Sequence, residues 1–536
     1  MLSCSINAEN KVEYYPLGAI NVFLIALLIH GKAERRIRKM GIGNDSFLSV
    51  AGGYARFVVS FPAKMIARVR AFLLIIVSVH AAKNFDSRNV VFTIIGQSEP
   101  YHSSVASRLK LDIENQVNEL EGREAITHIT HEDFSVPGAW TVIPLFRPLF
   151  TKYKGSDVRW VLFLEPHTAV RCGKLFEALA AADKQKDVMW VGYPLSDDEP
   201  TIIHHFTHFE ELEDVGGFLY PNFASGFAMK MGLLESVLDK MESGTVEIDA
   251  DFAIDPAFEL ARLIYGSRES PGPLLTRDLS FCVVSMDNCA TYPRQFDTCG
   301  SVVEDSIFFA VKTWSAFHST RARALKKTWG RHVTHLHFFS DQNDPSLPAT
   351  NIGLPNSKTG HCMKTIAILK EVVRRVQTMP QIKWIFLADD DTILGVQRLS
   401  EVLSCYRGGG DVTVLGERYG YGYGKKDAIH KGYDYITGGG GTALSVGAAK
   451  LLSQCACASL SAPDDMTLGA CATHRLHVPL THSPLFHQAR PQDYPREVLA
   501  RDRPISFHRH STPDPLKVYA TWFQHDDLAL RIRDEL

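Results

Sequence analysis

The stretch Trp384-Ile-Phe-Leu-Ala-Asp-Asp-Asp-Thr392 decides the fold, because it reads as a buried strand that ends in three adjacent carboxylates. Its first five residues are apolar on both faces, which is typical of a central parallel strand covered by helices on each side. An earlier stretch, Trp160-Val-Leu-Phe-Leu-Glu-Pro-His-Thr168, matches it, with Pro166 and His167 in place of two carboxylates. The sequence therefore contains two versions of one structural unit.

Other stretches repeat in the same order in both halves. Because short buried strands resemble one another, chance similarity is the alternative explanation. The order of the matches favours a repeat. The pairs are 90–94 with 306–310, 226–228 with 441–443 and, more weakly, 254–260 with 463–469. We predict a degenerate first copy at 86–269, a linker at 270–303 and a second copy at 304–532.

Each copy alternates short apolar runs with helical patterns, which predicts an α/β fold. In the second copy, strands are expected at Ile307–Val311, Leu336–Phe339 and Trp384–Ala388, and a helix at Met363–Val376. Ligands of such sheets bind beyond the carboxyl ends of the strands. The residues that follow each apolar run are therefore the first candidates for a site.

Length and charge limit the possible classes of protein. A chain of 536 residues exceeds one ordinary hydrophobic core, which predicts at least two domains. The formal net charge of −3 supplies no basic field for a phosphate backbone, so no nucleic-acid partner is expected. No apolar run is long enough to predict a stable transmembrane span.

Both ends of the chain carry targeting signals. The final Arg533-Asp534-Glu535-Leu536 matches the tetrapeptides that a retrieval receptor returns to the endoplasmic reticulum lumen. Residues 65–82 read as a signal peptide, with two arginines before the apolar run Ala71–Val79. We expect translation from Met65, which makes 1–64 a non-native or disordered extension. The alternative is a signal anchor at Val22–Ile29.

The second half is rich in cysteine, which an oxidising lumen allows to form structural disulfides. Sequence alone does not determine their pairing, and none has the spacing of a zinc site with histidines. The residues concerned are Cys282, Cys289, Cys299, Cys362, Cys405, Cys455, Cys457 and Cys471.

Asp389, Asp390 and Asp391 predict a divalent metal at the end of the strand. Adjacent carboxylates at a buried strand end repel one another, so a bound cation stabilises them. Mg²⁺ and Mn²⁺ take carboxylate oxygens together with substrate phosphates, which suits a nucleotide-sugar site. The alternative is a solvated acidic turn.

The motif series resembles the Fringe-related β1,3-glycosyltransferases. The two-copy layout and the tail are similar to the layout and tail of those members that transfer glucose to O-linked fucose on thrombospondin type 1 repeats. The resemblance implies two tandem GT-A-like, Rossmann-like nucleotide-sugar-binding domains, Mn²⁺, UDP-glucose and an inverting reaction. The stretches that carry the resemblance are 308–313, 389–391, 416–422, 436–441, 463–469, 484–491 and 504–508.

The resemblance also implies roles for individual residues. Asp389, Asp391 and His487 would hold Mn²⁺, although a lone histidine is more often a packed or surface residue. Asp465 would be the catalytic base and Asp464 a capping or orienting partner, although both could simply cap the helix expected at 466–472.

Two further groups are expected to bind substrates. Four glycines after a short strand form either a flexible loop or a close backbone approach to a sugar, and the resemblance favours the second. They are Gly438, Gly439, Gly440 and Gly441. The candidates for holding uridine or diphosphate are Asp390, Lys312, Thr313, Arg321, Asp341 and Lys364.

Two alternatives to glucosyltransfer stay open at this point. A metal site reads the diphosphate and not the hexose, so galactose or N-acetylglucosamine could be the transferred sugar. A non-catalytic lumenal lectin or folding factor could instead bind fucosylated domains through both copies, but the complete acidic triplet of the second copy argues against it.

Overall fold

The computed structural model describes residues 85–197, 203, 218–245, 252–267, 270–357, 360–423, 432–459, 462–501, 503–509 and 514–534, with four strands before them. The chain divides into two compact units, Met1–Asn84 and Phe85–Leu536. In the first unit, β1 (Leu2–Ile6) pairs with β2 (Val12–Pro16), and β3 (Phe47–Gly52) pairs with β4 (Ala55–Ser60).

The targeting predictions fall mainly outside the described residues. This holds for the signal peptide at 65–82, for the alternative anchor at 22–29 and for the last two residues of the retrieval signal. Among the described residues, no helix is both long and apolar enough to cross a membrane.

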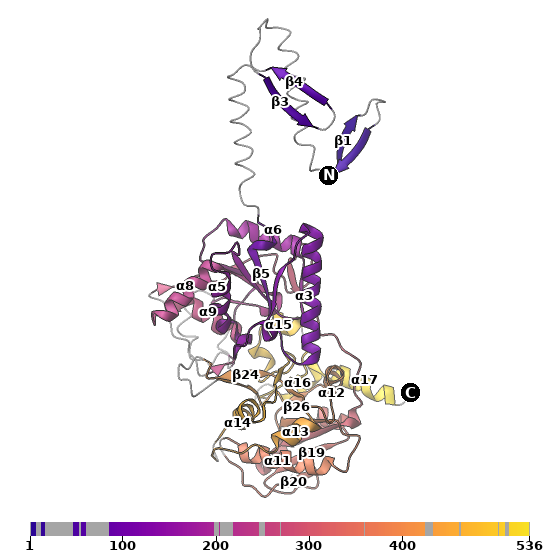
Figure 1. The fold of residues 1–536 in the computed structure, drawn as a ribbon. Coiled ribbons are helices and arrows are strands. Elements are labelled where there is room, and N and C mark those ends of the chain that lie inside the picture. The colour runs from indigo at the N-terminus through magenta and orange to yellow at the C-terminus, as the bar shows by residue number, and fades with distance from the viewer. Residues whose placement is uncertain are drawn as a thin grey trace. The chain divides into compact units, whose positions relative to one another are not determined.

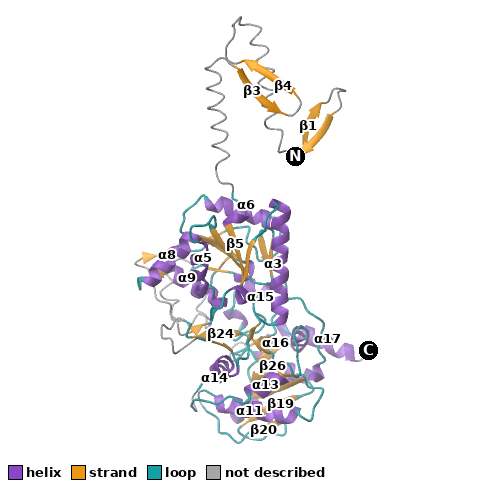
Figure 2. Cartoon of the chain, in the orientation of Figure 1, coloured by secondary structure: helices purple, strands orange, loops and turns teal. Residues whose placement is uncertain are grey.

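The second unit contains two large sheets, each covered by helices on both faces (Figures 1 and 2). In the first half, α3 (Pro100–Glu121) and α6 (Cys172–Asp183) pack on one face. The helices α5 (Phe146–Tyr153), α8 (Met231–Glu242) and α9 (Pro256–Tyr265) pack on the other. The sheet order is β16 (Thr276–Arg277), β9 (Trp190–Gly192), β12 (Phe227–Lys230), β7 (Trp160–Leu164), β5 (Val90–Ile94), β6 (Ile126–Ile129).

The second half has the same three layers. The helices α11 (Cys362–Val376) and α13 (Val446–Leu452) pack on one face, and α10 (Arg323–Lys327), α12 (Val396–Leu403) and α16 (Pro515–Trp522) on the other. The sheet order is β20 (Ala349–Asn351), β19 (Leu336–Ser340), β18 (Ile307–Lys312), β21 (Trp384–Asp389), β26 (Thr442–Ser445), β23 (Val414–Gly416), β27 (Thr481–His482).

The two sheets share strand order and direction. The run β6-β5-β7-β12-β9-β16 corresponds to β19-β18-β21-β26-β23-β27, with parallel and antiparallel neighbours at the same places. The register also agrees. Trp160 pairs with Lys230 in the first half, and Trp384 pairs with Ser445 in the second. The repeated stretches therefore occupy equivalent strands.

The turn after the central strand is also alike in both halves. The Thr168 hydroxyl accepts the backbone N–H of Glu165 at 3.2 Å and donates to the Ala224 carbonyl at 3.0 Å. In the second half, the Thr392 hydroxyl accepts the N–H of Asp389 at 3.2 Å and donates to the Gly439 carbonyl at 2.8 Å. The backbone is thus shared where the side chains differ.

The carboxyl edge of the first sheet contacts the second half. Gln97, which follows β5, donates from Nε2 to the His482 carbonyl at 3.1 Å and accepts the His482 N–H at 2.7 Å. A cavity of about 190 Å³ lies beside this contact, lined by Glu165 and Asp255 of the first half and by Glu417 and His487 of the second. The carboxyl edge of the first sheet, where a ligand site would be expected, is therefore in contact with the second half.

Part of the predicted linker 270–303 pairs with strands of the first half. Strand β16 joins the first sheet beside β9, and β17 (Thr291–Pro293) pairs with β8 (Thr168–Val170). Residues up to Pro293 therefore belong to the first half.

The expected disulfides are confirmed: the eight cysteines from Cys282 onward form four bonds. The pairs are Cys282–Cys289, Cys299–Cys405, Cys362–Cys457 and Cys455–Cys471.

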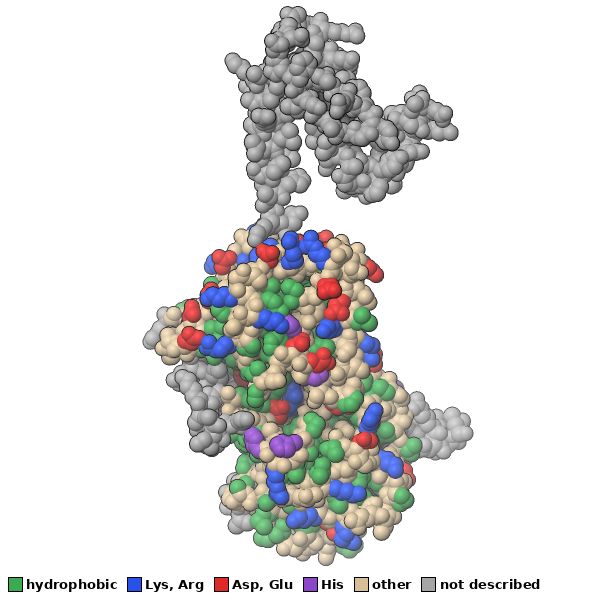
Figure 3. All heavy atoms as spheres, in the orientation of Figure 1, with side chains coloured by type: hydrophobic (Ala, Val, Ile, Leu, Met, Phe, Trp, Pro, Cys, Tyr) green, Lys and Arg blue, Asp and Glu red, His purple; other side chains and the backbone are tan. Residues whose placement is uncertain are grey.

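Basic and acidic side chains are interspersed over the face seen in Figure 3.

Candidate active site

The candidate site lies where β18 and β21 end side by side. Lys312 and Asp389, the last residues of these parallel strands, are register partners. Lys312 Nζ lies 3.0 Å from Asp389 Oδ1 and 2.6 Å from Asp464 Oδ2. Burial lowers the pKa of Lys312, but the two carboxylates outweigh that effect and raise it above its ordinary value. A charged ammonium therefore joins the acidic strand end to α14 (Asp464–Cys471).

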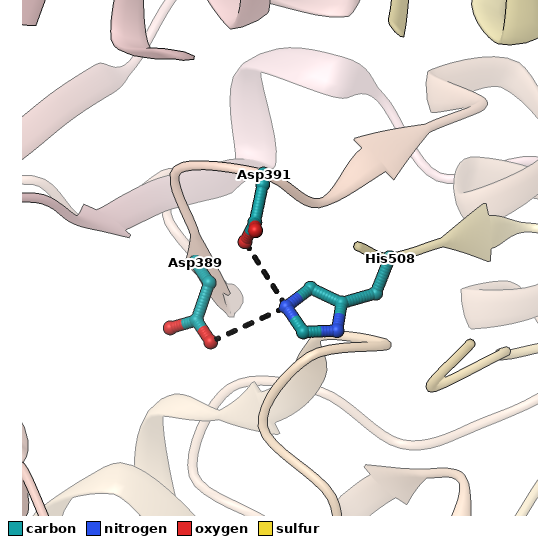
Figure 4. Close-up of side chains that lie close together, drawn as sticks. All are labelled: Asp389, Asp391 and His508. Atoms are coloured by element: carbon teal, nitrogen blue, oxygen red, sulfur yellow. Dashed lines mark ion pairs between the residues drawn. The ribbon is translucent and has the colours of Figure 1, made fainter. Parts of the chain in front are cut away.

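Asp389, Asp391 and His508 form a group that can hold a metal ion (Figure 4). One ligand atom from each lies within 4.8 Å of the others. His508 Nε2 is 3.0 Å from Asp391 Oδ1 and 3.8 Å from Asp389 Oδ2. His508 follows β28 (Ser506–Phe507), which pairs with β22 (Ile393–Leu394) just after the aspartates. The strand pairing thus brings the distant histidine to the turn.

The structure places His508, and not the predicted His487, beside Asp389 and Asp391. His487 is buried, with its ring against Tyr494 and Phe507 and its Nδ1 3.1 Å from the Leu485 carbonyl oxygen. His508 stands with the aspartates in its place. The signal for His508 was present in the stretch 504–508, but sequence gives no distance between either histidine and the aspartates.

Asp390 is not part of this metal-binding group and has other partners. Its Oδ2 accepts the Thr313 hydroxyl at 2.6 Å, and its Oδ1 lies 3.6 Å from Arg321 NH1. Burial raises the pKa of Asp390 to about 6, with Asp391 and Asp389 adding to the increase. Arg321 also pairs with Asp391 at 2.9 Å. Thr313 and Arg321, two of the predicted donor-binding residues, therefore both contact Asp390, a third.

Asp464 does not cap its helix. Its Oδ2 accepts the Thr365 hydroxyl and the Lys312 ammonium, each at 2.6 Å, and no side-chain bond caps the start of α14. Burial raises the pKa of Asp464, but Lys312 outweighs burial and leaves it below its ordinary value. Asp464 is therefore an ionised group that orients Lys312.

Asp465 has the properties of a proton acceptor. Burial, followed by the charge of Asp464, raises its pKa to about 6, while its Oδ1 accepts the Met466 N–H at 2.7 Å. A catalytic base is most effective when its pKa lies near the working pH. The carboxylate of Asp465 can therefore take up a proton under mild conditions, which an ordinary aspartate does less readily.

The two remaining donor-binding candidates hold backbone near Thr313. Asp341 accepts the Ser315 N–H at 2.8 Å and the Ser315 hydroxyl at 3.0 Å. Lys364 donates to the Thr313 carbonyl, and its burial lowers its pKa. Both side chains thus shape the segment that follows β18.

The glycine run lies against the histidine of the metal-binding group. A Cβ on Gly439 would lie under 3.0 Å from the His508 ring, and one on Gly441 would strike Phe386. Gly441 also has a φ of 84°, where glycine is favoured. The run is therefore a close-packed turn, which supports the interpretation as a backbone approach over that of a flexible loop.

The donor set fits a divalent metal such as Mn²⁺, which accepts carboxylate and imidazole together. His508 Nδ1 lies 3.0 Å from the Gln488 carbonyl oxygen and donates to it, so Nε2 is the nitrogen directed at the aspartates. A hydrogen bond of this kind from the other ring nitrogen orients metal-bound histidines generally.

Comparison with known proteins shows the family of the chain. Residues 302–528 match the family described as Fringe-like. The chain is 40% identical over 449 residues to "Beta-1,3-glucosyltransferase" of Homo sapiens, covering 83% of this chain and 86% of that protein. The chain belongs to the Fringe-related β1,3-glucosyltransferase family.

Two further proteins are similar to this chain. The Mus musculus "Beta-1,3-glucosyltransferase" is 39% identical over 444 residues, covering 82% of this chain and 87% of that protein. The Danio rerio "Beta-1,3-N-acetylglucosaminyltransferase manic fringe" is 26% identical over 219 residues, covering 36% of this chain and 60% of that protein. Membership implies an enzyme that transfers a hexosyl group from a nucleotide-sugar donor. The glucosyltransferase relatives match both halves.

Proposed function

We propose that the chain is a lumenal, inverting β1,3-glucosyltransferase that moves glucose from UDP-glucose to O-linked fucose on thrombospondin type 1 repeats. The observation that carries the proposal is the convergence of Asp389, Asp391 and His508 with Asp465 at one sheet edge. Similarity to the named glucosyltransferases over most of the chain supports glucose as the transferred sugar.

Asp465 is the base in this reaction. Its carboxylate removes the proton from the fucose O3 hydroxyl, and that oxygen attacks the anomeric carbon of glucose as the bond to UDP breaks. A positioned base contributes about 10²- to 10⁴-fold to such a step. The single displacement inverts the anomeric carbon and needs no covalent intermediate.

The cationic residues of the site hold the diphosphate. Arg321 and Lys312 are the charged donors beside the aspartates, at 2.9 Å from Asp391 and 3.0 Å from Asp389. Asp389, Asp391 and His508 would hold Mn²⁺, which when bound neutralises charge on the departing diphosphate. Asp464 keeps Lys312 charged and in place.

The first half is a degenerate glycosyltransferase copy in this proposal. The shared strand order, register and threonine turn support a common origin. Pro166 and His167 stand in place of two aspartates, and Pro256 occupies the position of the repeat that corresponds to Asp465. The side chains needed for metal binding and for base catalysis are thus missing from this half, which serves as a support.

The tail 533–536 supports retrieval to the endoplasmic reticulum by a receptor, and four disulfides suit an oxidising lumen. An acceptor carrying O-linked fucose meets the enzyme in that compartment under this proposal.

A donor panel tests the function. Purified protein is incubated with Mn²⁺, a fucosylated thrombospondin repeat and UDP-glucose, UDP-galactose or UDP-N-acetylglucosamine, and products are identified by mass. We expect transfer from UDP-glucose to fucose only. Transfer from UDP-N-acetylglucosamine would instead favour the activity of the N-acetylglucosaminyltransferase relatives. No transfer from any donor would favour a lectin or folding factor.

A further inference from the structure

Glu417 and Gln488 connect the cavity between the halves to the candidate active site. Glu417 follows β23 and lines the cavity, and its Oε2 accepts the backbone N–H of Gln488. Its Oε1 lies 3.4 Å from the Tyr494 hydroxyl, which accepts the N–H of Ala489 at 3.1 Å. The buried carboxyl group therefore binds the backbone N–H of Gln488 directly and reaches that of Ala489 through the Tyr494 hydroxyl.

Gln488 carries this constraint to the glycine run. Its side-chain Oε1 accepts the N–H of Gly439 at 2.9 Å and that of Gly440 at 3.2 Å. Ser506 donates to the Gly440 carbonyl at 2.5 Å, so the turn is held on its other side as well. An amide oxygen that bridges two successive N–H groups fixes the orientation of both peptide planes.

Gln488 also fixes the metal-binding histidine. Its backbone carbonyl accepts the bond from His508 Nδ1 at 3.0 Å, which leaves Nε2 3.0 Å from Asp391 Oδ1. A single residue thus contacts the glycine run through its side chain and His508 through its backbone. Gly439 packs against the His508 ring, so the two contacts are adjacent.

We propose that Glu417 and Gln488 are positioning residues, which hold the glycine run and His508 in the geometry that the reaction needs. The inference rests on the proposed function and deepens it, since neither residue belongs to the metal-binding group or the base. Glu417 lines a cavity that Glu165 and Asp255 also line. The first half therefore lies across this cavity from Glu417.

Hydrogen–deuterium exchange tests the link to the glycine run directly, in the full chain and without donor or metal. In Gln488→Ala the amides of Gly439 and Gly440 lose their acceptor, and we expect their exchange to accelerate by about 10-fold or more. Gln488→Glu keeps an acceptor oxygen and should retain most of the protection. Equal protection in the wild type and Gln488→Ala would overturn the link.

Mn²⁺ affinity, measured by calorimetry, tests the link to His508. Glu417→Ala releases the Gln488 backbone, whose carbonyl is the partner of His508, and should weaken binding by about 10-fold, the lower end of the range for loss of such a partner. Glu417→Gln keeps an acceptor and should stay near wild type, whereas Gln488→Ala keeps the carbonyl and should bind Mn²⁺ normally. Unchanged affinity in Glu417→Ala, or equal loss in Glu417→Gln, would refute the role of Glu417.

Kinetics separate this inference from the proposed function. Gln488→Ala should lower kcat more than it raises the KM for donor, and Gln488→Glu should recover most of the loss. A wild-type protein with no transferase activity would refute the proposed function, while the exchange rates and the metal affinity would still decide the positioning roles. Far-ultraviolet circular dichroism identifies variants that fail to fold, and Gln488→Met and Glu417→Met, which also remove the acceptor oxygen but keep the length of the side chain, then replace them in the comparison.

Discussion

The ammonium group of Lys312 lies 2.6 Å from the carboxylate of Asp464, although the two residues are 152 positions apart. This ion pair joins the end of β18 to the start of α14, the helix that carries Asp465. The same ammonium is 3.0 Å from Asp389. The metal-binding turn and the helix of the base are therefore held together by one side chain.

Replacing Lys312 by methionine should destabilise the protein. Removing one member of a buried ion pair leaves the partner charge uncompensated, which costs about 3 to 5 kcal/mol. Added Mn²⁺ should restore part of the loss, because a ligand that binds only the folded state stabilises it. Urea denaturation with and without Mn²⁺ measures both effects. Arg374→Met, which breaks an exposed pair with Glu371, should leave the midpoint nearly unchanged.

Transfer should depend on pH through Asp465. A raised pKa means that the base takes up its proton at a higher pH than an ordinary aspartate, so its active carboxylate form is lost as the pH falls through about 6. The kcat/KM at saturating Mn²⁺ should therefore be level above pH 7 and decline about 10-fold per unit well below pH 6. A rate that stayed level down to pH 4.5 would exclude this assignment.

Asp465→Asn should separate catalysis from binding. The amide cannot accept the proton, so transfer should fall at least about 10²-fold, while the affinity for UDP stays near that of the wild type. Calorimetry with UDP and Mn²⁺ supplies the binding measurement. Equal loss of transfer and UDP affinity would show that Asp465 is needed to build the site and is not specifically the base.

The two histidines should respond differently to substitution. His508→Ala removes a ligand and should weaken Mn²⁺ binding by at least about 10-fold, as even partners of ligands have effects of that size. His487→Phe keeps an aromatic ring against Tyr494 and Phe507 and should leave Mn²⁺ affinity unchanged. Electron paramagnetic resonance of free Mn²⁺ measures both. The reverse result would restore the assignment made from the sequence.

The sequence predicted the strands and the helix that follow from the local pattern of apolar residues. The apolar runs became β18, β19 and β21, and the helix expected at 363–376 became α11. Sequence could not choose between His487 and His508, because the antiparallel pairing of β28 with β22 decides which one reaches the aspartates. It also could not show that Glu417 supports the glycine run, because a lone buried glutamate carries no periodic signal.

The glycine run offers the most selective test of how closely the site is packed. A Cβ on Gly439 would lie under 3.0 Å from the His508 ring, whereas one on Gly438 would meet no atom within 4 Å. Gly439→Ala should therefore displace the ring or the turn, weaken Mn²⁺ binding by about 10-fold or more and lower transfer in proportion. Gly438→Ala should leave Mn²⁺ affinity near that of the wild type. If both substitutions leave Mn²⁺ affinity and transfer unchanged, the turn yields easily, and close packing of the glycine run against His508 does not fix the metal-binding geometry.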